Sequence, residues 1–330
     1  MRPYHEPKPA LVERMKILLK DENDVKAFFE MSKIPGKRSI RVNRLKISPT
    51  DLIKRLKEKN WNVSQPISNH PEIIQICSEL LPGELGKSEE HLLGYYYVQE
   101  ITSMMPILAL QPKADDILLD LCAAPGSKTT QAAVLMENKG TIIANDLNIG
   151  RISILSANLE RFGITNTIIT RHDGLELCER LQKSKTKIRF DKILVDAPCS
   201  GEGNIRCSPG TYLEWSENLL KSLGKRQKKL SSAALELLKI NGEMVYSTCT
   251  HSPEENEEVV QHLLDNYDIK IEQIKLPLKT RPGISEWKGK TFSEEIKKAA
   301  RIYHHDNDLE GFFLCKIKKL SDNKKQEEKI

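Results

Sequence analysis

No C-x-x-C pair occurs among the seven cysteines of this 330-residue chain, and no stretch approaches 18 consecutive apolar residues. The first absence argues against a zinc ribbon or a thioredoxin-type redox site. The second excludes a membrane-spanning helix, and the first ten residues lack the apolar segment of a secretory signal. We therefore expect a soluble, cytoplasmic protein with reduced thiols, no metal and no membrane contact.

Acidic residues are scarce in the first 60 positions, where 16 Lys and Arg stand against 8 Asp and Glu. The net charge of the whole chain is only +5, so the remainder carries a slight negative excess. A basic segment on a slightly acidic body suggests an anionic partner that docks at one end. If that partner is nucleic acid, we expect Arg41 and Arg44 to contact its phosphates. A solvated lysine-rich face is the alternative.

Local patterns divide the chain near residue 105. Residues 8–34 carry apolar side chains at helical spacing, whereas the alternation over 39–47 predicts a strand. Ser48 followed by Pro49 is typical of a helix start, and a short second strand follows that helix. From residue 115 onward, apolar runs alternate with helical stretches such as 149–162. The runs that we expect to be strands are 116–121, 141–146, 167–173, 192–198 and 243–249.

This alternation indicates an α/β protein with a Rossmann-like, doubly wound parallel sheet. In such sheets ligands bind beyond the carboxyl ends of the strands, so function is to be sought in the polar residues at those ends. Asp146 ends one predicted strand, where a carboxylate suits the hydroxyls of a ribose. Asp173 follows the next strand and could accept a hydrogen bond from an adenine amino group. Strand-end aspartates also cap helices, which is the alternative for each.

The segment LDLCAAPGSKT, residues 119–129, joins a predicted strand to a helix through small residues. Ala123, Ala124 and Gly126 would let a ligand approach the backbone and the free N–H groups of the helix. The segment has no G-x-G-x-x-G and lacks the spacing of a phosphate-binding P-loop, so it matches neither nucleotide motif. A tight turn without a ligand remains the alternative.

Two further segments each carry a cysteine after a predicted strand: DAPCSGEG (196–203) and YSTCTHSPEENE (246–257). A thiolate is a strong nucleophile, and a nearby helix N-terminus lowers a thiol pKa. Ser252-Pro253-Glu254-Glu255 resembles a capping box, which predicts a helix start three residues after Cys249. Burial as an inert structural thiol is the alternative.

Together, LDLCAAPGSKT, IIANDLNIGR, VDAPCSGEG and YSTCTHSPEENE resemble the NOL1/NOP2/Sun (NSUN, RsmB-like) family of RNA cytosine-5 methyltransferases, over residues 38–318. SIRVNRLKI resembles a strand of that family's N-terminal RNA-binding subdomain. Two positions depart from the family pattern: Ser127 replaces a usual Gly, and His304 replaces a usual Pro.

The resemblance implies a small α+β (RRM-like) RNA-binding subdomain with preceding helices in residues 1–105, a catalytic domain in 106–320 and a disordered tail in 321–330. It implies S-adenosylmethionine as cofactor. The residues expected to bind it are Cys122, Ala123, Ala124, Pro125, Gly126, Ser127, Lys128, Asp146, Arg151, Asp173 and Asp196.

The resemblance also implies the catalytic roles. The Thr-Cys cysteine, Cys249, is the nucleophile that adds to cytosine C6, and the Pro-Cys cysteine, Cys199, assists release. Asp196 supports the N3/N4 edge of the base, and Lys128 orients Asp196 or the base. The partner is RNA, with tRNA favoured over rRNA, and we expect a monomer.

Three alternatives stay open. A DNA cytosine-5 methyltransferase would use Cys199 as its nucleophile. A non-catalytic scaffold would keep only the cofactor pocket and RNA binding. A redox protein would join Cys199 and Cys249 in a disulfide, although no C-x-x-C supports it.

Overall fold

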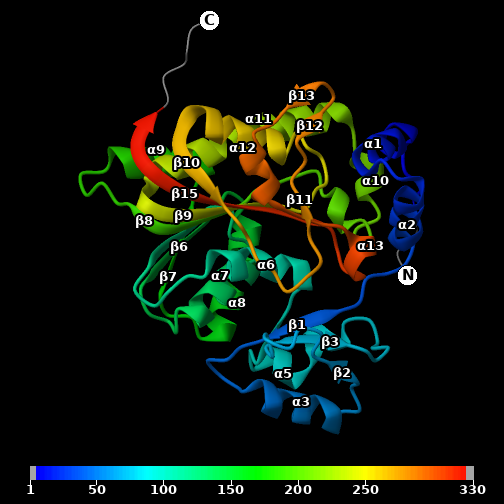
Figure 1. Ribbon diagram of the computed structural model, residues 1–330. Helices are drawn as coiled ribbons and strands as arrows, with labels where there is room; N and C mark the ends of the chain where they lie inside the picture. The colour runs from blue at the N-terminus through cyan, green and yellow to red at the C-terminus, as the bar shows by residue number, and fades with distance from the viewer. Residues whose placement is uncertain (1–4, 325–330) are drawn as a thin grey trace, which may run out of the picture.

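The computed structural model describes residues 5–324, which form a large sheet, a small sheet and a separate two-stranded hairpin (Figure 1). The small sheet lies below the large one in this view and is formed by β1 to β4. Its order is β2-β3-β1-β4 with antiparallel pairing throughout. Along the chain its subdomain contains β1 (Ser39–Val42), α3 (Pro49–Glu58), β2 (Val63–Ser64), β3 (Ile73–Ile76), α4 (Glu84–Lys87), α5 (Glu89–Leu92) and β4 (Tyr96–Val98). This succession and strand order are those of the expected RRM-like fold.

Local sequence signals fix one end of α3 but not the end of β1. As predicted, Ser48 caps α3, with its hydroxyl accepting from the Asp51 N–H at 3.1 Å. The strand predicted over 39–47 instead stops at Val42. The buried Asn43 turns the chain, because its amide donates to the backbone oxygens of Gly94 and Phe162 at 3.0 and 2.9 Å. Those partners lie far away in the sequence, so the pattern of alternation could not reveal the end of the strand.

The large sheet follows the order β11-β14-β15-β9-β8-β5-β6-β7, with β10 also paired to β15. The predicted parallel part is confirmed from β7 to β9. These strands are β5 (Ile117–Asp120), β6 (Thr141–Asp146), β7 (Thr167–Arg171), β8 (Phe190–Asp196) and β9 (Leu238–Thr248). The sheet then continues with antiparallel strands that the sequence analysis did not predict: β10 (Tyr267–Glu272), β11 (Arg281–Pro282), β14 (Ala300–Ile302) and β15 (Phe312–Lys324). A separate hairpin joins β12 (Glu286–Trp287) and β13 (Lys290–Thr291).

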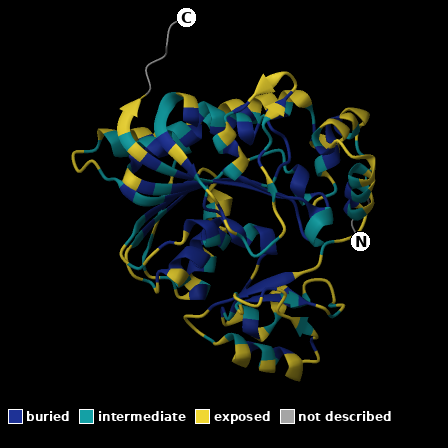
Figure 2. Ribbon diagram, in the orientation of Figure 1, coloured by how far each residue is buried: buried dark blue, intermediate teal, exposed yellow. Residues whose placement is uncertain are grey.

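Helices cover both faces of the large sheet, whose strands are mostly buried (Figure 2). Leu118 of β5 packs in one apolar cluster with α6 (Ile101–Leu110) and α7 (Ser127–Leu135). Its neighbour Leu119 packs in the other, with α9 (Gly174–Lys183), α11 (Glu217–Leu237) and α12 (Glu257–Asn266). Successive side chains of a strand point to opposite faces of the sheet because the backbone is pleated. Burial of each leucine side chain stabilises the folded state by about 1.5–3 kcal/mol. α8 (Ile149–Phe162) buries the predicted Leu155, Leu159 and Phe162.

The first two helices pack on the part of the chain that holds the large sheet, not on the small sheet. α1 (Pro9–Leu19) and α2 (Glu22–Ser32) share a buried cluster with Trp215 and Tyr303. The grouping of these helices with the RRM-like subdomain stays a prediction; in the structure, aromatic side chains of the part that holds the large sheet cover their apolar faces. α6 also runs across the expected boundary at 105/106. Within residues 5–324, no helix combines the length and apolarity needed to cross a bilayer.

The expected disordered tail over 321–330 is wrong for its first four residues. β15 continues to Lys324, which pairs with Tyr267 of β10, and the Ser321 hydroxyl donates to Asp268 at 2.7 Å. This pairing with β10 orders a segment whose composition alone predicts disorder. Residues 325–330 lie outside the described part of the chain. The remaining short elements are η1 (Glu202–Asn204), α10 (Thr211–Glu214), η2 (Glu294–Lys298) and α13 (His304–Asn307).

Candidate active site

The turn between β5 and α7 brings the backbone of residues 121–126 beside the end of β6. The Ala123 N–H donates to the Asn145 oxygen at 2.7 Å, and the Gly126 N–H donates to the Ala123 oxygen at 2.8 Å. Gly126 has φ of +100°, which glycine adopts without strain, and an added Cβ would lie 2.8 Å from Leu155. No side chain of the described residues caps α7, so its first N–H groups stay directed at the turn. The small-residue segment is thus a compact backbone cradle next to a helix N-terminus.

Asp146 and Arg151 brace this cradle. The buried Asp146 carboxylate accepts from the Asn148 N–H at 3.0 Å and the Ala124 N–H at 3.3 Å. Arg151 approaches Asp146 at 3.4 Å and donates to the Ala124 oxygen. The acid predicted at this strand end therefore lies directly against the Ala-Ala-Pro-Gly turn.

Asp120 lies on the central strand between those of Asp146 and Asp196. One of its carboxylate oxygens accepts from the Thr129 hydroxyl at 2.7 Å, and the other has no hydrogen-bond partner among the described residues. Burial raises its pKa to about 7. Burial also raises the pKa of the Cys122 thiol well above its usual range, so that thiol stays protonated.

Asp173, expected to face an adenine, already has two other partners. It caps α9 by accepting from the Leu175 N–H at 2.9 Å, and it forms an ion pair with Arg226 at 2.9 Å. Asp173 therefore caps a helix, which was the alternative considered from the sequence. It also follows β7, the strand next to β6.

The two cysteines lie in contact. Cys199 follows β8 and Cys249 follows β9, and these neighbouring parallel strands end at the same edge of the sheet. Their sulfur atoms are 3.1 Å apart, and both are free thiols. The hydrogen bond with Cys249, together with burial, raises the pKa of Cys199 well above its usual range. Cys199 is therefore held as a neutral thiol beside its partner.

The helix predicted three residues after Cys249 begins later than expected, at Glu257. The capping box does not form because long-range partners take its side chains. The Ser252 hydroxyl donates to Glu202 at 2.7 Å, and the Glu255 carboxylate accepts from the Ser200 N–H at 3.1 Å. Turns occupy the intervening residues. A capping argument for activation of Cys249 is therefore not supported.

Asp196, at the end of β8, has Lys128 as its partner. The ammonium nitrogen lies 2.7 Å from one carboxylate oxygen, and the Ser247 hydroxyl donates to the other at 2.7 Å. Lys128 also donates to the Ser103 hydroxyl at 3.0 Å. The structure thus pairs Asp196 with Lys128 and brings the two cysteines into contact, at the ends of the neighbouring strands β8 and β9. Sequence reasoning missed Ser103 and Ser247; only the position of Ser247 two residues before Cys249 could have pointed to it.

Arg41 is not available to phosphates, contrary to the sequence-based expectation. It is 2% exposed and donates to Gln99 at 2.5 Å, to the Ser127 oxygen at 2.7 Å and to Thr130 at 2.8 Å. Burial lowers its pKa to about 9. A buried guanidinium needs hydrogen bonds, and the start of α7 supplies them. Arg44 is exposed, as expected.

His304, which replaces the usual Pro, lies fully buried and donates through Nε2 to the Phe28 oxygen at 2.7 Å. Burial lowers its pKa to about 4. The side chain therefore ties α13 to α2 as a neutral imidazole. Ser127, the second departure, occupies the first position of α7, and its oxygen accepts from Arg41.

Comparison with known proteins agrees with this geometry. Residues 107–318 match the family described as 16S rRNA methyltransferase RsmB/F, and residues 8–101 match the N-terminal domain of 16S rRNA methyltransferase RsmF. Ribosomal RNA small subunit methyltransferase F of Vibrio cholerae is 39% identical over 318 residues, which cover 96% of this chain and 64% of that protein. The chain thus spans less than two thirds of that relative.

A second relative is matched over nearly its whole length. The tRNA (cytosine(49)-C(5))-methyltransferase of Pyrococcus abyssi is 41% identical, with 94% of this chain and 95% of that protein covered. Among solved structures, NSun6 from Pyrococcus horikoshii with SFG superposes with a TM-score of 0.81 at 26% identity, covering 95% of this chain and 98% of the other. By these matches, the chain belongs to the RsmB/F family of methyltransferases.

Proposed function

We propose that this protein is an S-adenosylmethionine-dependent RNA cytosine-5 methyltransferase that forms 5-methylcytosine through a covalent intermediate on Cys249. The observation that carries the proposal is the contact between the Cys199 and Cys249 sulfurs at 3.1 Å. The ion pair of Asp196 with Lys128 lies at the end of the same strand that precedes Cys199. Two thiols and a carboxylate at one sheet edge suit nucleophilic addition to a pyrimidine.

The cradle after β5 fits the cofactor. Asp146 ends β6 with a buried carboxylate, which suits the two hydroxyls of a ribose. The Asp120 oxygen without a partner among the described residues suits an ammonium group. We assign the pocket to Cys122, Ala123, Ala124, Pro125, Gly126, Ser127, Lys128, Asp146, Arg151, Asp173 and Asp196. When bound, S-adenosylmethionine supplies a methyl group on a sulfonium, which is transferred to cytosine C5.

The residues of the chain make C5 reactive. The Cys249 thiolate forms a bond to C6, and the ring electrons move toward N3, where negative charge develops. Asp196 lies at that edge of the base, and the charge of Lys128 stabilises the developing anion. After C5 has been methylated, the C5 proton passes to water. The electron pair of the C5–H bond re-forms the C5–C6 double bond as the C6–S bond breaks, which restores the Cys249 thiolate and the aromatic ring. We assign Cys199 to this release, because its neutral thiol can donate a hydrogen bond to the departing sulfur.

The target base must leave its stack to reach the two cysteines. We propose tRNA as the substrate class, with rRNA as the second candidate. The relative named as a tRNA methyltransferase supports tRNA, because this chain aligns with 95% of its length. Methylation assays on unmodified tRNA and 16S rRNA transcripts, followed by bisulfite sequencing, decide between them. Conversion-resistant cytosines only in the rRNA would refute the tRNA assignment.

The roles of the cysteines are tested with two alanine variants and labelled RNA on one denaturing gel. Cys249→Ala should abolish methylation and give no protein–RNA adduct. Cys199→Ala should still permit attack and methyl transfer but stall before release, leaving an adduct that survives denaturation. An adduct from Cys249→Ala and none from Cys199→Ala would reverse the assignment, as a DNA-type enzyme requires. Retained activity in both variants would show that neither thiol reacts.

A further inference from the structure

Two buried glutamates connect the loops that carry the cysteines. Glu202 follows Cys199 in the loop after β8, yet its carboxylate binds the other loop. It accepts from the Thr250 hydroxyl and the His251 N–H, both at 3.2 Å, and from the Ser252 hydroxyl at 2.7 Å. The indole N–H of Trp215 donates to it as well. Glu202 thereby orders the three residues that directly follow Cys249.

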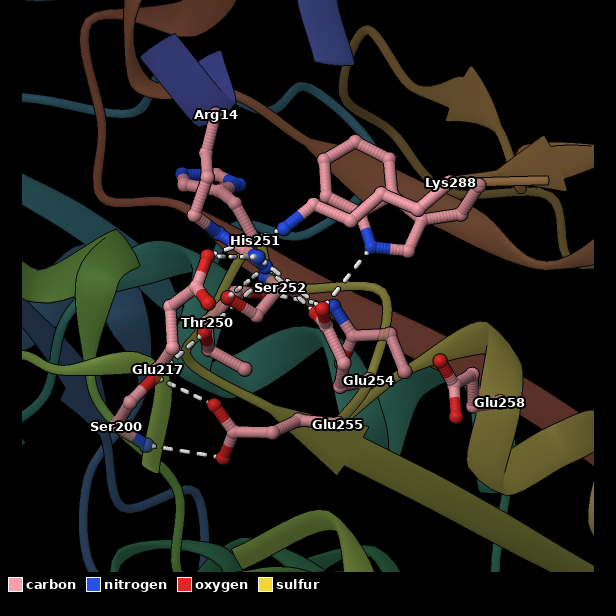
Figure 3. A network of polar contacts seen from close by, with 12 residues as sticks. Arg14, Ser200, Glu217, Thr250, His251, Ser252, Glu254, Glu255, Glu258 and Lys288 are labelled. Carbon is pink, nitrogen blue, oxygen red and sulfur yellow. Dashed lines mark hydrogen bonds and ion pairs between the residues drawn. The ribbon is translucent and has the colours of Figure 1, made fainter. Parts of the chain in front are cut away.

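Glu255 makes the reverse connection. It lies in the segment after Cys249, fully buried, and accepts from the Ser200 hydroxyl at 2.5 Å and the Ser200 N–H at 3.1 Å (Figure 3). Gln227 of α11 donates to the same carboxylate at 2.9 Å. The residue directly after Cys199 is therefore fixed by a side chain from the Cys249 loop.

We propose that Glu202 and Glu255 are positioning residues, a reciprocal brace that holds the Cys199 and Cys249 sulfurs in contact for attack and release. The carboxylate of Glu202, on the Cys199 loop, binds residues next to Cys249. The carboxylate of Glu255, on the Cys249 loop, binds the residue next to Cys199. Backbone contacts add to the brace, since the Gly203 N–H donates to the Cys249 oxygen at 2.8 Å. The contact between the two sulfurs is a property of the free protein. The effect of that contact on attack and release rests on the proposed function.

Hydrogen bonds to a buried carboxylate are strong, and removal of a partner leaves a desolvated group unpaired. Glu→Gln at either position keeps the shape but turns one acceptor oxygen into a donor facing N–H or O–H groups. The loops should then separate, while the strands that carry them keep their pairing. Glu254 offers a matched control: it is the neighbour of Glu255, but it pairs with Arg14 at 2.6 Å (Figure 3). It also accepts from Trp287 at 3.0 Å.

The first test needs no RNA. Diamide is added to the reduced protein, and formation of the Cys199–Cys249 disulfide is followed by mass spectrometry. Each disulfide formed gives up two protons and two electrons, which reduce the N=N bond of diamide to a hydrazine. The wild type and Glu254→Gln should form it at similar rates. Glu202→Gln and Glu255→Gln should be slower by about tenfold or more, because a displacement near 1 Å can cost about 10²-fold.

The second test measures turnover. In Glu255→Gln the kcat for methylation should fall while the KM for RNA stays unchanged, since the carboxylate touches neither substrate. Single-turnover assays exclude a simple loss of stability, because a destabilised protein has a smaller active fraction but an unchanged rate of the covalent step. If Glu255→Gln fails to fold, Ser200→Ala removes the hydroxyl bond to Glu255 from the other side. If Glu202→Gln fails to fold, Ser252→Ala removes the hydroxyl bond to Glu202 in the same way.

Disulfide rates in folded Glu202→Gln and Glu255→Gln equal to that of Glu254→Gln would overturn the proposal, as would a wild-type protein whose two thiols never join. A wild type that forms the disulfide as expected but neither methylates RNA nor forms an adduct would leave the brace supported and refute the proposed function instead.

Discussion

Arg41 is the residue whose structural role departs most from the sequence-based expectation, and Arg41→Met tests that role. The substitution keeps most of the apolar stem but removes the donors to Gln99, Ser127 and Thr130. A hydrogen bond from a charged group contributes about 1.5–3 kcal/mol, but loss of the buried charge itself offsets part of this. We expect the free energy of unfolding to fall by about 2–4 kcal/mol.

The same change should also affect the proposed cofactor pocket. The oxygen of Ser127 belongs to the residue that begins α7, directly after the cradle. Tyr97, beside Arg41 on the same sheet face, donates to the Pro125 oxygen at 3.2 Å. Loosening this support should weaken S-adenosylmethionine binding by about tenfold, or 1.4 kcal/mol. Denaturant unfolding and calorimetric titration measure the two effects.

Arg44→Met is the matched control, since Arg44 is exposed and has no hydrogen bond or ion pair with another described residue. If the basic segment contacts RNA, this variant should reduce the slope of log affinity against log salt by about one and leave stability unchanged. Arg41→Met should leave that slope unchanged. A stable Arg41→Met protein with normal cofactor affinity and a reduced slope would refute the structural reasoning and restore the phosphate contact.

Three further variants test the site. Asp146→Ala should weaken cofactor binding by about 1–3 kcal/mol in calorimetry, and wild-type affinity in a folded variant would contradict the ribose assignment. Asp120→Asn should stabilise the cofactor-free protein at pH 8. The folded-state pKa of about 7 lies above the ordinary 3.8, so this gain should be lost as pH falls from about 7 to about 4; a gain independent of pH would refute the burial argument. Arg301→Met leaves the buried Glu257 without its partner at 2.5 Å and should cost about 3–5 kcal/mol in urea unfolding, whereas a loss below about 1 kcal/mol would contradict an intact buried pair.

Features with local signals were predicted correctly. The Ser48 cap of α3, the span of α8 and the strands that end in Asp120, Asp146 and Asp196 all follow from residues close in sequence. The contact between Cys199 and Cys249 followed as well, because the carboxyl ends of neighbouring parallel strands meet at one edge. That rule was enough to bring Cys199 and Cys249 to one place.

Errors arose where a polar side chain binds a distant partner. Asn43 ends β1 through Phe162, and Ser252 leaves its capping box for Glu202. Arg41 contributes to the basic count of residues 1–60, yet its guanidinium is buried under α7. Composition gives the number of charges but not the direction of each side chain, so these contacts could not be predicted from sequence.

The burial of Arg41 also restricts the proposed binding of RNA by the small subdomain. In RRM domains, aromatic side chains on the sheet face stack on bases. Here Arg41 pairs with Ile73 and Tyr97 in neighbouring strands, so all three share one face, and they are 2%, 1% and 7% exposed. That face packs on the catalytic part, where Tyr97 contacts the cofactor cradle. Bases cannot stack there, so the proposed function predicts RNA contacts at exposed residues such as Lys54 and Lys57 of α3, while the sheet supports the proposed cofactor pocket.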